Sequence, residues 1–178
     1  MVAVEMLFSS ALVGLVGAAE HPDAPSYEVR LWNTQGGGPS GASVCDPLTF
    51  PEPVLGVRMN RERLLAILAS KVHVFELASM RLLHSVDTSH NPRGLGCISS
   101  DSSPGYSALV GGADAGSLFL FDTTQLVALG TVSAHRHALA CMGFSSCGRL
   151  VATASLKGTV VRVHICPSGQ LAHTCRRV

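Results

Sequence analysis

The feature that most constrains the fold is a repeat of short, β-prone segments along the 178-residue chain. Four of these segments end in a similar apolar run, and they cover residues 27–34, 71–78, 116–123 and 158–165. Spacings of 43, 46 and 43 residues separate their central apolar residues, which are Leu31, Val74, Leu120 and Val163. Four-stranded propeller blades repeat every 40 to 45 residues or so, whereas leucine-rich repeats are far shorter. The period therefore indicates blades.

Each unit divides further into short apolar runs separated by polar turns. The last unit gives four such runs, at residues 139–146, 149–155, 159–165 and 170–177. Residues 145–149 (SSCGR) combine polar residues with a glycine, which is typical of a hairpin turn. No long stretch of the sequence has apolar residues at i, i+3, i+4 and i+7, the spacing of an amphipathic helix. We therefore predict an all-β, WD-repeat-like β-propeller of about four four-stranded blades, with approximate boundaries at residues 1–50, 51–90, 91–134 and 135–178.

The composition excludes two classes of protein. Charged residues make up only 14% of the chain, against about 25% in an average soluble domain, and 47% of residues are hydrophobic. A disordered chain needs the opposite balance. Because 13 basic residues face 12 acidic ones, the net charge of +1 also argues against nucleic-acid binding through bulk positive charge.

The uncharged stretch at residues 6–19 is similar in composition to a signal-peptide core. The five residues before it include an acid and neither Lys nor Arg, which is the reverse of a positively charged signal-peptide start. The stretch is also shorter than the roughly 20 residues that span a bilayer. Because Ser9 and Ser10 separate two apolar runs, we predict a strand, a turn and a second strand here.

The cysteines show neither a CxxC pair nor the spacing of a zinc site. Most of the six lie in apolar runs, where a free thiol behaves as a small buried hydrophobic group: Cys45, Cys97, Cys141, Cys147, Cys166 and Cys175. We therefore expect reduced, mostly buried thiols, no metal and no cofactor.

Signals of catalysis are weak. Residues 111–116 are glycine-rich but lack the Gly-Lys-Ser/Thr of a phosphate-binding loop, so we interpret them as a loop between strands. A nucleophile elbow of the GxSxG type is absent. His135 and His137 lack an accompanying metal-ligand motif, and such a pair in a turn is more often a surface feature. The chain is predicted not to be an enzyme.

Arg176 and Arg177 stand next to each other at the end of a predicted strand. Successive side chains of a strand point to opposite faces, so in a propeller these two guanidinium groups would face different clefts. Arginine is the side chain best suited to bidentate phosphate binding. The alternative, a solvated chain end, stays open on this observation alone.

Several motifs resemble the PROPPIN family. They are Val4 to Phe8, VRMNRER at 57–63, LLH at 82–84, NPRGL at 91–95, Ala134-His135, and above all ATASLKGTVVRV at 152–163 followed by SGQLAHTCRR at 168–177. Members of this family are seven-bladed WD-repeat-like propellers that bind phosphatidylinositol 3-phosphate and the 3,5-bisphosphate and act in autophagy. The resemblance therefore implies a non-enzymatic lipid-binding scaffold that is cytoplasmic and peripheral on phagophore, endosomal or vacuolar membranes.

The family's headgroup motif is Phe/Leu-Arg-Arg-Gly, which supplies one Arg to each of two pockets. The resemblance places Arg176 and Arg177 at these two positions. The flanking residues depart from the motif, since Cys175 replaces the aromatic or leucine residue and Val178 replaces the glycine.

The resemblance also implies that the first pocket uses His135 and the Ser, Lys and Thr of the SxKGT turn, which are Ser155, Lys157 and Thr159. Cations, an imidazole and hydroxyls together satisfy the many acceptor oxygens of a phosphorylated inositol. Without the resemblance, ordinary hairpin chemistry also explains Ser155, Lys157 and Thr159.

The chain is short for such a propeller, because seven blades of this period need about 300 residues. The four units resemble the family's second to fifth blades, so we expect part of a ring; a complete four-bladed propeller is the alternative. Two functions follow from this. The first is a phosphoinositide-binding scaffold that contacts membranes and autophagy proteins and binds no nucleic acid. The second is a truncated propeller that acts only in protein–protein interaction.

Overall fold

A computed structural model of the chain describes residues 3–18, 25–36, 42–100, 103 and 105–176. These residues form seventeen strands in four antiparallel sheets, and none of them lies in a helix. The described part of the chain accordingly offers no helix that could cross a bilayer.

Each sheet is built from strands that follow one another along the chain. Sheet A contains β1 (Ala3–Met6), β2 (Leu12–Val16), β3 (Glu28–Asn33), β4 (Ala42–Ser43) and β5 (Leu48–Thr49). Sheet B contains β6 (Gly56–Met59), β7 (Arg63–Ile67), β8 (Lys71–Glu76) and β9 (Leu82–Asp87). Sheet C contains β10 (Gly96–Ile98), β11 (Tyr106–Val110), β12 (Ser117–Asp122) and β13 (Val127–Ser133). Sheet D contains β14 (Leu139–Phe144), β15 (Leu150–Ser155), β16 (Val160–Ile165) and β17 (Leu171–Arg176).

The all-β architecture predicted from the repeat is confirmed. The four residues that define the period each occupy the fourth position of the third strand of their sheet, namely Leu31, Val74, Leu120 and Val163. Sheet A departs from the plain pattern, because β4 and β5 share the outer edge of β3 as two short strands. Pro47 lies in the interruption between them and has no amide hydrogen to donate to the ladder.

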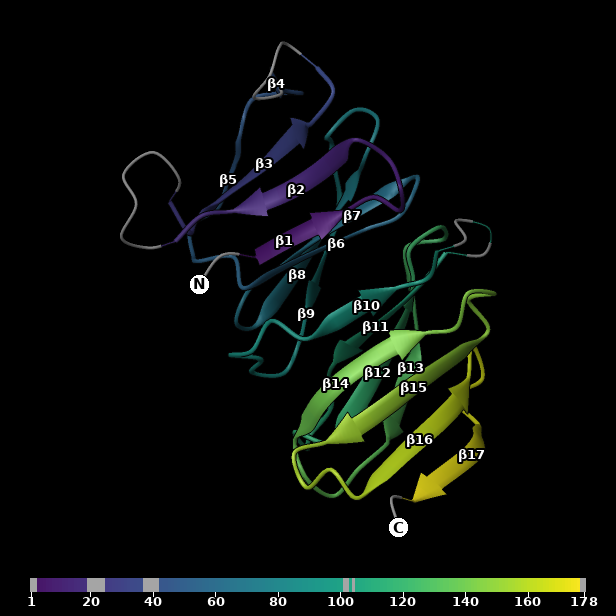
Figure 1. The fold of residues 1–178 in the computed structure, drawn as a ribbon. Helices are drawn as coiled ribbons and strands as arrows, with labels where there is room; N and C mark the ends of the chain where they lie inside the picture. Colours follow the sequence, from purple (N-terminus) through teal and green to yellow (C-terminus); the bar gives the residue numbers. More distant parts are fainter. Residues whose placement is uncertain (1–2, 19–24, 37–41, 101–102, 104, 177–178) are drawn as a thin grey trace.

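The sheets follow one another in an arc (Figure 1), with the first strands of neighbouring sheets in contact along its inner side: β1 with β6, β6 with β10, and β10 with β14. Hairpins then lead outward from each first strand to the fourth. The predicted turns are where the sequence placed them, since residues 145–149 join β14 to β15 and residues 111–116 join β11 to β12. Gly148 has a φ of 67°, which an L side chain rarely adopts.

The hydrophobic core lies between neighbouring sheets. Val16 and Leu31 of sheet A pack with Val57 of sheet B, and all three are at most 2% exposed. The same layering recurs between sheets B and C, and again between sheets C and D, where Leu118 and Val151 are fully buried. Burying apolar area stabilises a fold by about 25 cal/mol per Å². These three layers are the main source of stability.

The two end sheets each leave an apolar face uncovered by the described residues. On sheet A, Val4 and Met6 are 58% and 56% exposed, and on sheet D, Val161 is 40% exposed. Cys175 pairs with Val161 across the ladder and lies on the same open face. Cys141 lies there too, because it pairs with Ala154, which in turn pairs with Val161. The expectation of mostly buried thiols is therefore wrong: only Cys97 and Cys166 are buried, and no described residue packs over Cys141 or Cys175. Cys147 is exposed in a turn.

Candidate functional site

The turn between β15 and β16 holds three of the predicted site residues. Ser155 ends β15 and is 6% exposed, whereas Lys157 and Thr159 are exposed in the turn. Gly158, with a φ of 69°, donates its amide to the Ser155 carbonyl at 2.9 Å and closes the turn. A second backbone bond of 2.9 Å, from the Leu156 amide to the Ala138 carbonyl, fixes the turn against the segment before β14.

His135 lies in that segment and is buried, with 6% of its surface exposed. Its Nε2 atom is 3.1 Å from Thr153 Oγ1 and 3.2 Å from the Thr153 carbonyl oxygen. Burial lowers the pKa of His135, the bond to Thr153 opposes this, and the charge of Arg162 lowers the pKa further. The interpretation of His135 and His137 as a surface pair is therefore wrong for His135. The chain bends at Arg136 and His137, and of the two histidines only His137 is exposed.

Gly116 explains how His135 reaches this position. The His135 amide donates to the Gly116 carbonyl at 2.9 Å, and a Cβ added at Gly116 would lie 2.0 Å from the His135 carbonyl oxygen. Only a glycine permits the two backbones to approach this closely. The glycine-rich loop between β11 and β12 thus supports the segment that carries His135.

Arg162 belongs to the ATASLKGTVVRV motif, but the sequence did not predict it as a site residue. It lies in β16 directly opposite Thr153 of β15, and paired residues of neighbouring strands point to the same face. Its guanidinium donates a hydrogen bond to the Ala134 carbonyl, next to His135. The available signal was a lone cation inside the apolar run VVRVHI.

Arg176 is the last residue of β17 and is exposed. It pairs with Val160, while Thr174 pairs with Arg162. Because side chains alternate along a strand, Arg176 and Arg162 share the face of sheet D that also bears Thr153 and looks toward sheet C. The strand register therefore brings Arg176 to the side of the sheet where His135 lies.

Arg177 and Val178 lie outside the described residues. The prediction that Arg177 points into a second pocket on the opposite face of the sheet consequently stays a prediction.

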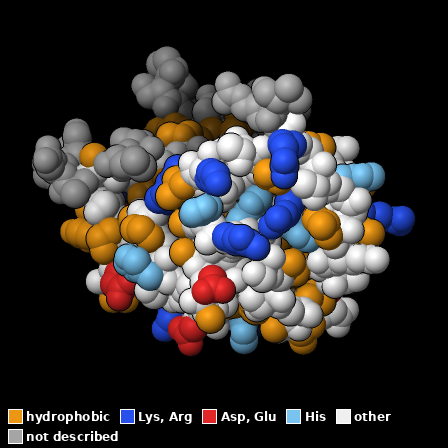
Figure 2. Space-filling view, turned by 90° about the horizontal axis from the view of Figure 1, so that it is seen from below, with side chains coloured by type: hydrophobic (Ala, Val, Ile, Leu, Met, Phe, Trp, Pro, Cys, Tyr) orange, Lys and Arg blue, Asp and Glu red, His pale blue; other side chains and the backbone are white. Residues whose placement is uncertain are grey.

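The face is positive and lacks local neutralisation. Within the described part of the chain, no acidic side chain forms an ion pair with Lys157, Arg162 or Arg176. In Figure 1 the β15–β16 turn and the end of β17 lie at the lower edge of the molecule, and Figure 2 shows that Lys, Arg and His side chains gather on the side seen from below. Such a surface favours an anionic ligand.

His164 adds a buried imidazole to the same face. It is 3% exposed, and its Nδ1 atom has no hydrogen-bond partner. Burial lowers the pKa of His164, and His135 and Arg162 lower it further. The imidazoles are thus held neutral beside a guanidinium, so positive charge resides on the arginines and the lysine.

Metal binding finds no support among the described residues, where no three His, Cys, Asp or Glu side chains are grouped to hold an ion.

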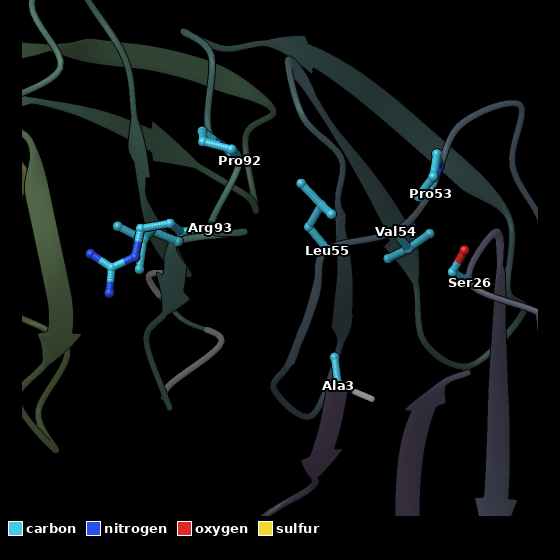
Figure 3. Close-up of a pocket in the computed structure, with 8 residues that line it drawn as sticks. Ala3, Ser26, Pro53, Val54, Leu55, Pro92 and Arg93 are labelled. Atoms are coloured by element: carbon cyan, nitrogen blue, oxygen red, sulfur yellow. The ribbon is translucent and has the colours of Figure 1, made fainter. Parts of the chain in front are cut away.

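A pocket separate from this face lies at the starts of the inner strands β1, β6 and β10. It has a volume of about 470 Å³ and is lined by Ala3, Ser26, Pro53, Val54, Leu55, Pro92, Arg93 and Leu95. Figure 3 shows Val54 and Leu55 between Ser26 on one side and Pro92 and Arg93 on the other, so the pocket spans three sheets. Asn91 orders its rim, because its side chain exchanges two hydrogen bonds with the Leu95 backbone at 2.8 and 3.0 Å.

Comparison with known proteins assigns the family. The chain matches the PROPPIN family model over residues 1–178. It belongs to the PROPPIN family. The resemblance found in the sequence motifs is thereby confirmed.

Curated relatives of this PROPPIN chain are autophagy-related proteins. It is 33% identical to Autophagy-related protein 18 of Yarrowia lipolytica, with 98% of the chain and 48% of the relative covered. Autophagy-related protein 21 of Pichia angusta is 36% identical, with 98% and 46% covered, and Autophagy-related protein 18b of Arabidopsis thaliana is 34% identical, with 99% and 47% covered. The chain thus spans about half the length of these relatives.

Solved PROPPIN structures share the fold. The structure of KlAtg21 in complex with the coiled coil of AgAtg16 has a TM-score of 0.80 and 27% identity, covering 98% of this chain and 56% of that one. Kluyveromyces lactis Hsv2 has a TM-score of 0.76 at 15% identity, covering 98% and 50%. The four sheets are therefore propeller blades that correspond to about half of these rings, as predicted.

Proposed function

We propose that this chain binds the headgroups of phosphatidylinositol 3-phosphate and phosphatidylinositol 3,5-bisphosphate and acts as a non-enzymatic scaffold in autophagosome formation. Membership of the PROPPIN family and the autophagy-related relatives support this proposal. The proposed location is the cytoplasmic surface of phagophore, endosomal or vacuolar membranes.

The observation that carries the proposal is the convergence of unneutralised cations and hydroxyls around the β15–β16 turn. Lys157 and Thr159 lie in the turn, Ser155 ends the strand before it, and the β-ladder sets Arg162 and Arg176 on one face. A headgroup phosphate presents several acceptor oxygens, which guanidinium, ammonium and hydroxyl groups satisfy as donors. In this proposal His135, whose ring is held by Thr153, fixes the segment that borders the headgroup.

Vesicle sedimentation tests the proposal. Arg176→Glu combined with Lys157→Glu should abolish binding to phosphatidylcholine vesicles that contain phosphatidylinositol 3-phosphate, because both cations become anions that repel the headgroup. The matched control is Arg61→Glu with Arg81→Glu, which changes the net charge equally at the turns of sheet B. Equal binding of the parent protein to plain phosphatidylcholine vesicles would refute the proposal.

The proposed second pocket requires a separate variant. Arg177→Glu alone should weaken binding less than Arg176→Glu, because Arg176 shares its face of sheet D with a second cation, Arg162. The double variant Arg176→Glu, Arg177→Glu should bind no more than the plain-vesicle background. A larger loss for Arg177→Glu than for Arg176→Glu would contradict this order.

The alternative function is protein interaction without lipid binding. Two observations favour it: Cys175 and Val178 depart from the family's headgroup motif, and the pocket of Figure 3 offers an apolar recess on the first three sheets. One structurally similar protein, KlAtg21, was solved with the coiled coil of AgAtg16. A pulldown with an Atg16 coiled coil, with and without soluble inositol phosphate, separates the two functions. Capture of the coiled coil by a chain that binds no vesicles would establish the alternative.

A further inference from the structure

Leu156 is the most exposed large hydrophobic side chain in the described part of the chain, with 62% of its surface accessible. It lies in the β15–β16 turn between Ser155 and Lys157. The other residues of this turn are polar or glycine, so a leucine at its tip has no folding role as a core residue.

The turn that presents Leu156 is held by backbone hydrogen bonds. The Leu156 amide donates to Ala138 at 2.9 Å, and the Gly158 amide donates to Ser155 at 2.9 Å. A preordered turn loses little conformational entropy when its side chain meets a partner. Leu156 is thus presented ready for contact with an apolar partner.

Beside Leu156 runs an apolar groove of about 280 Å³. Its walls include Pro92, Leu95, Val110 and Leu139, and Arg93 stands at the groove with its side chain exposed. Leu156 itself lines the groove together with Arg93, and Lys157 follows Leu156 in the turn. Apolar side chains flanked by cations are typical of protein surfaces that bind in the interface of anionic membranes.

We propose that Leu156 is a membrane-penetrating side chain that enters the apolar part of the bilayer interface when the neighbouring turn residues hold a lipid headgroup. This inference rests on the proposed function. A headgroup bound at Ser155, Lys157 and Thr159 places the bilayer surface beside Leu156, since all four residues belong to one turn. The bilayer is favoured over an apolar protein segment because Lys157 and Arg93 complement an anionic surface.

Membrane penetration by Leu156 can be separated from headgroup recognition with two ligands that carry the same headgroup, one in vesicles and one soluble. Leu156→Ser should weaken binding to phosphatidylcholine vesicles containing phosphatidylinositol 3-phosphate about tenfold, the order expected for partial burial of one leucine side chain. Binding of soluble inositol 1,3-bisphosphate should stay unchanged, because that ligand has no acyl chains. The matched control is Leu82→Ser, which removes a leucine of 50% exposure from β9, the outer strand of sheet B.

A spectroscopic readout follows the side chain directly. Leu156→Trp should shift its fluorescence to shorter wavelength when phosphatidylinositol 3-phosphate vesicles are added, but not when inositol 1,3-bisphosphate is added. The chain contains a single tryptophan, Trp32, so the parent protein supplies the spectrum to subtract.

Each outcome has a distinct meaning. A parent protein that binds neither vesicles nor soluble headgroup would end the proposed function and this inference with it. Unchanged vesicle binding by Leu156→Ser in a parent that binds both ligands would overturn penetration alone. Equal loss of both ligands would also overturn it, because Leu156 would then support the fold of the turn. Loss of self-association on size-exclusion chromatography, with vesicle binding intact, would assign Leu156 to a contact between copies.

Discussion

His135 Nε2 lies 3.1 Å from Thr153 Oγ1, so one hydrogen bond joins the segment before β14 to the second strand of the same blade. We expect Thr153→Val to cost about 1–2 kcal/mol of unfolding free energy, because it removes the hydroxyl's hydrogen bonds with His135 and with the Arg162 carbonyl, while the Thr153 carbonyl still accepts from His135. Soluble headgroup binding should weaken as well, since the ring loses its fixed orientation. Urea denaturation and calorimetric titration measure the two effects.

Thr153→Ser keeps the hydroxyl and should restore headgroup binding to the parent value. Headgroup affinity that is equal in Thr153→Val and the parent would show that His135 needs no positioning by Thr153.

Acid should destabilise the folded chain through its buried histidines. Burial lowers the pKa of both His135 and His164, and the charge of Arg162 lowers both further. In the unfolded chain a histidine titrates near about pH 6.5. Below that pH the unfolded state binds protons that the folded state does not yet bind. The contribution of these histidines to the free energy of unfolding is therefore complete above about pH 6.5, and it decreases as the pH falls toward the folded pKa values.

The variant His164→Leu isolates one of these two groups. It removes the unpartnered Nδ1 atom from a side chain that is 3% exposed, so stability at neutral pH should be equal or higher. The decrease in Tm between about pH 7.5 and about pH 5.5 should be smaller than in the parent. An identical decrease in both proteins would place the acid sensitivity elsewhere.

The fold was predictable from sequence because the blade pattern is local and repeated. Alternation of apolar residues, the period set by Leu31, Val74, Leu120 and Val163, and glycine-containing turns all depend on near neighbours. The division of the outer strand of sheet A into β4 and β5 carried no such periodic signal. Exposure of Cys141 and Cys175 was also hidden, because it depends on which residues distant in sequence pack over each face of sheet D.

The site was predictable only in part, for a related reason. The turn residues Ser155, Lys157 and Thr159 lie within five consecutive residues, so a motif identifies them. Arg162 joins them through β-ladder register and through a hydrogen bond to Ala134, which is 28 residues away in sequence. Burial of His135 depends on the close approach of the Gly116 backbone. Neither the alternation of apolar and polar residues nor the composition of the chain predicts such an approach.

Substitution at Gly116 should show how much the site depends on that approach. Gly116→Ala would place a Cβ 2.0 Å from the His135 carbonyl oxygen and 2.7 Å from that of His137. Because both neighbours are backbone atoms, the segment must move, and we expect a loss of about 1–3 kcal/mol together with weaker headgroup binding. Gly143→Ala is the matched control, since nothing lies within 4 Å of its added Cβ. Equal stability of the two variants in urea would contradict the close approach.

The two faces of sheet D should respond differently to the same substitution. Val151 is fully buried against sheet C, whereas Val161 is 40% exposed on the open face. Val151→Thr places an unpaired hydroxyl in the core and should cost about 1–3 kcal/mol. Val161→Thr keeps the shape of the side chain and leaves its hydroxyl in water, so its cost should be within about 0.5 kcal/mol.

Urea denaturation compares the two variants, and sedimentation velocity on the same samples reports association. A large loss for Val161→Thr accompanied by dissociation of an oligomer would show that a second copy covers the open face.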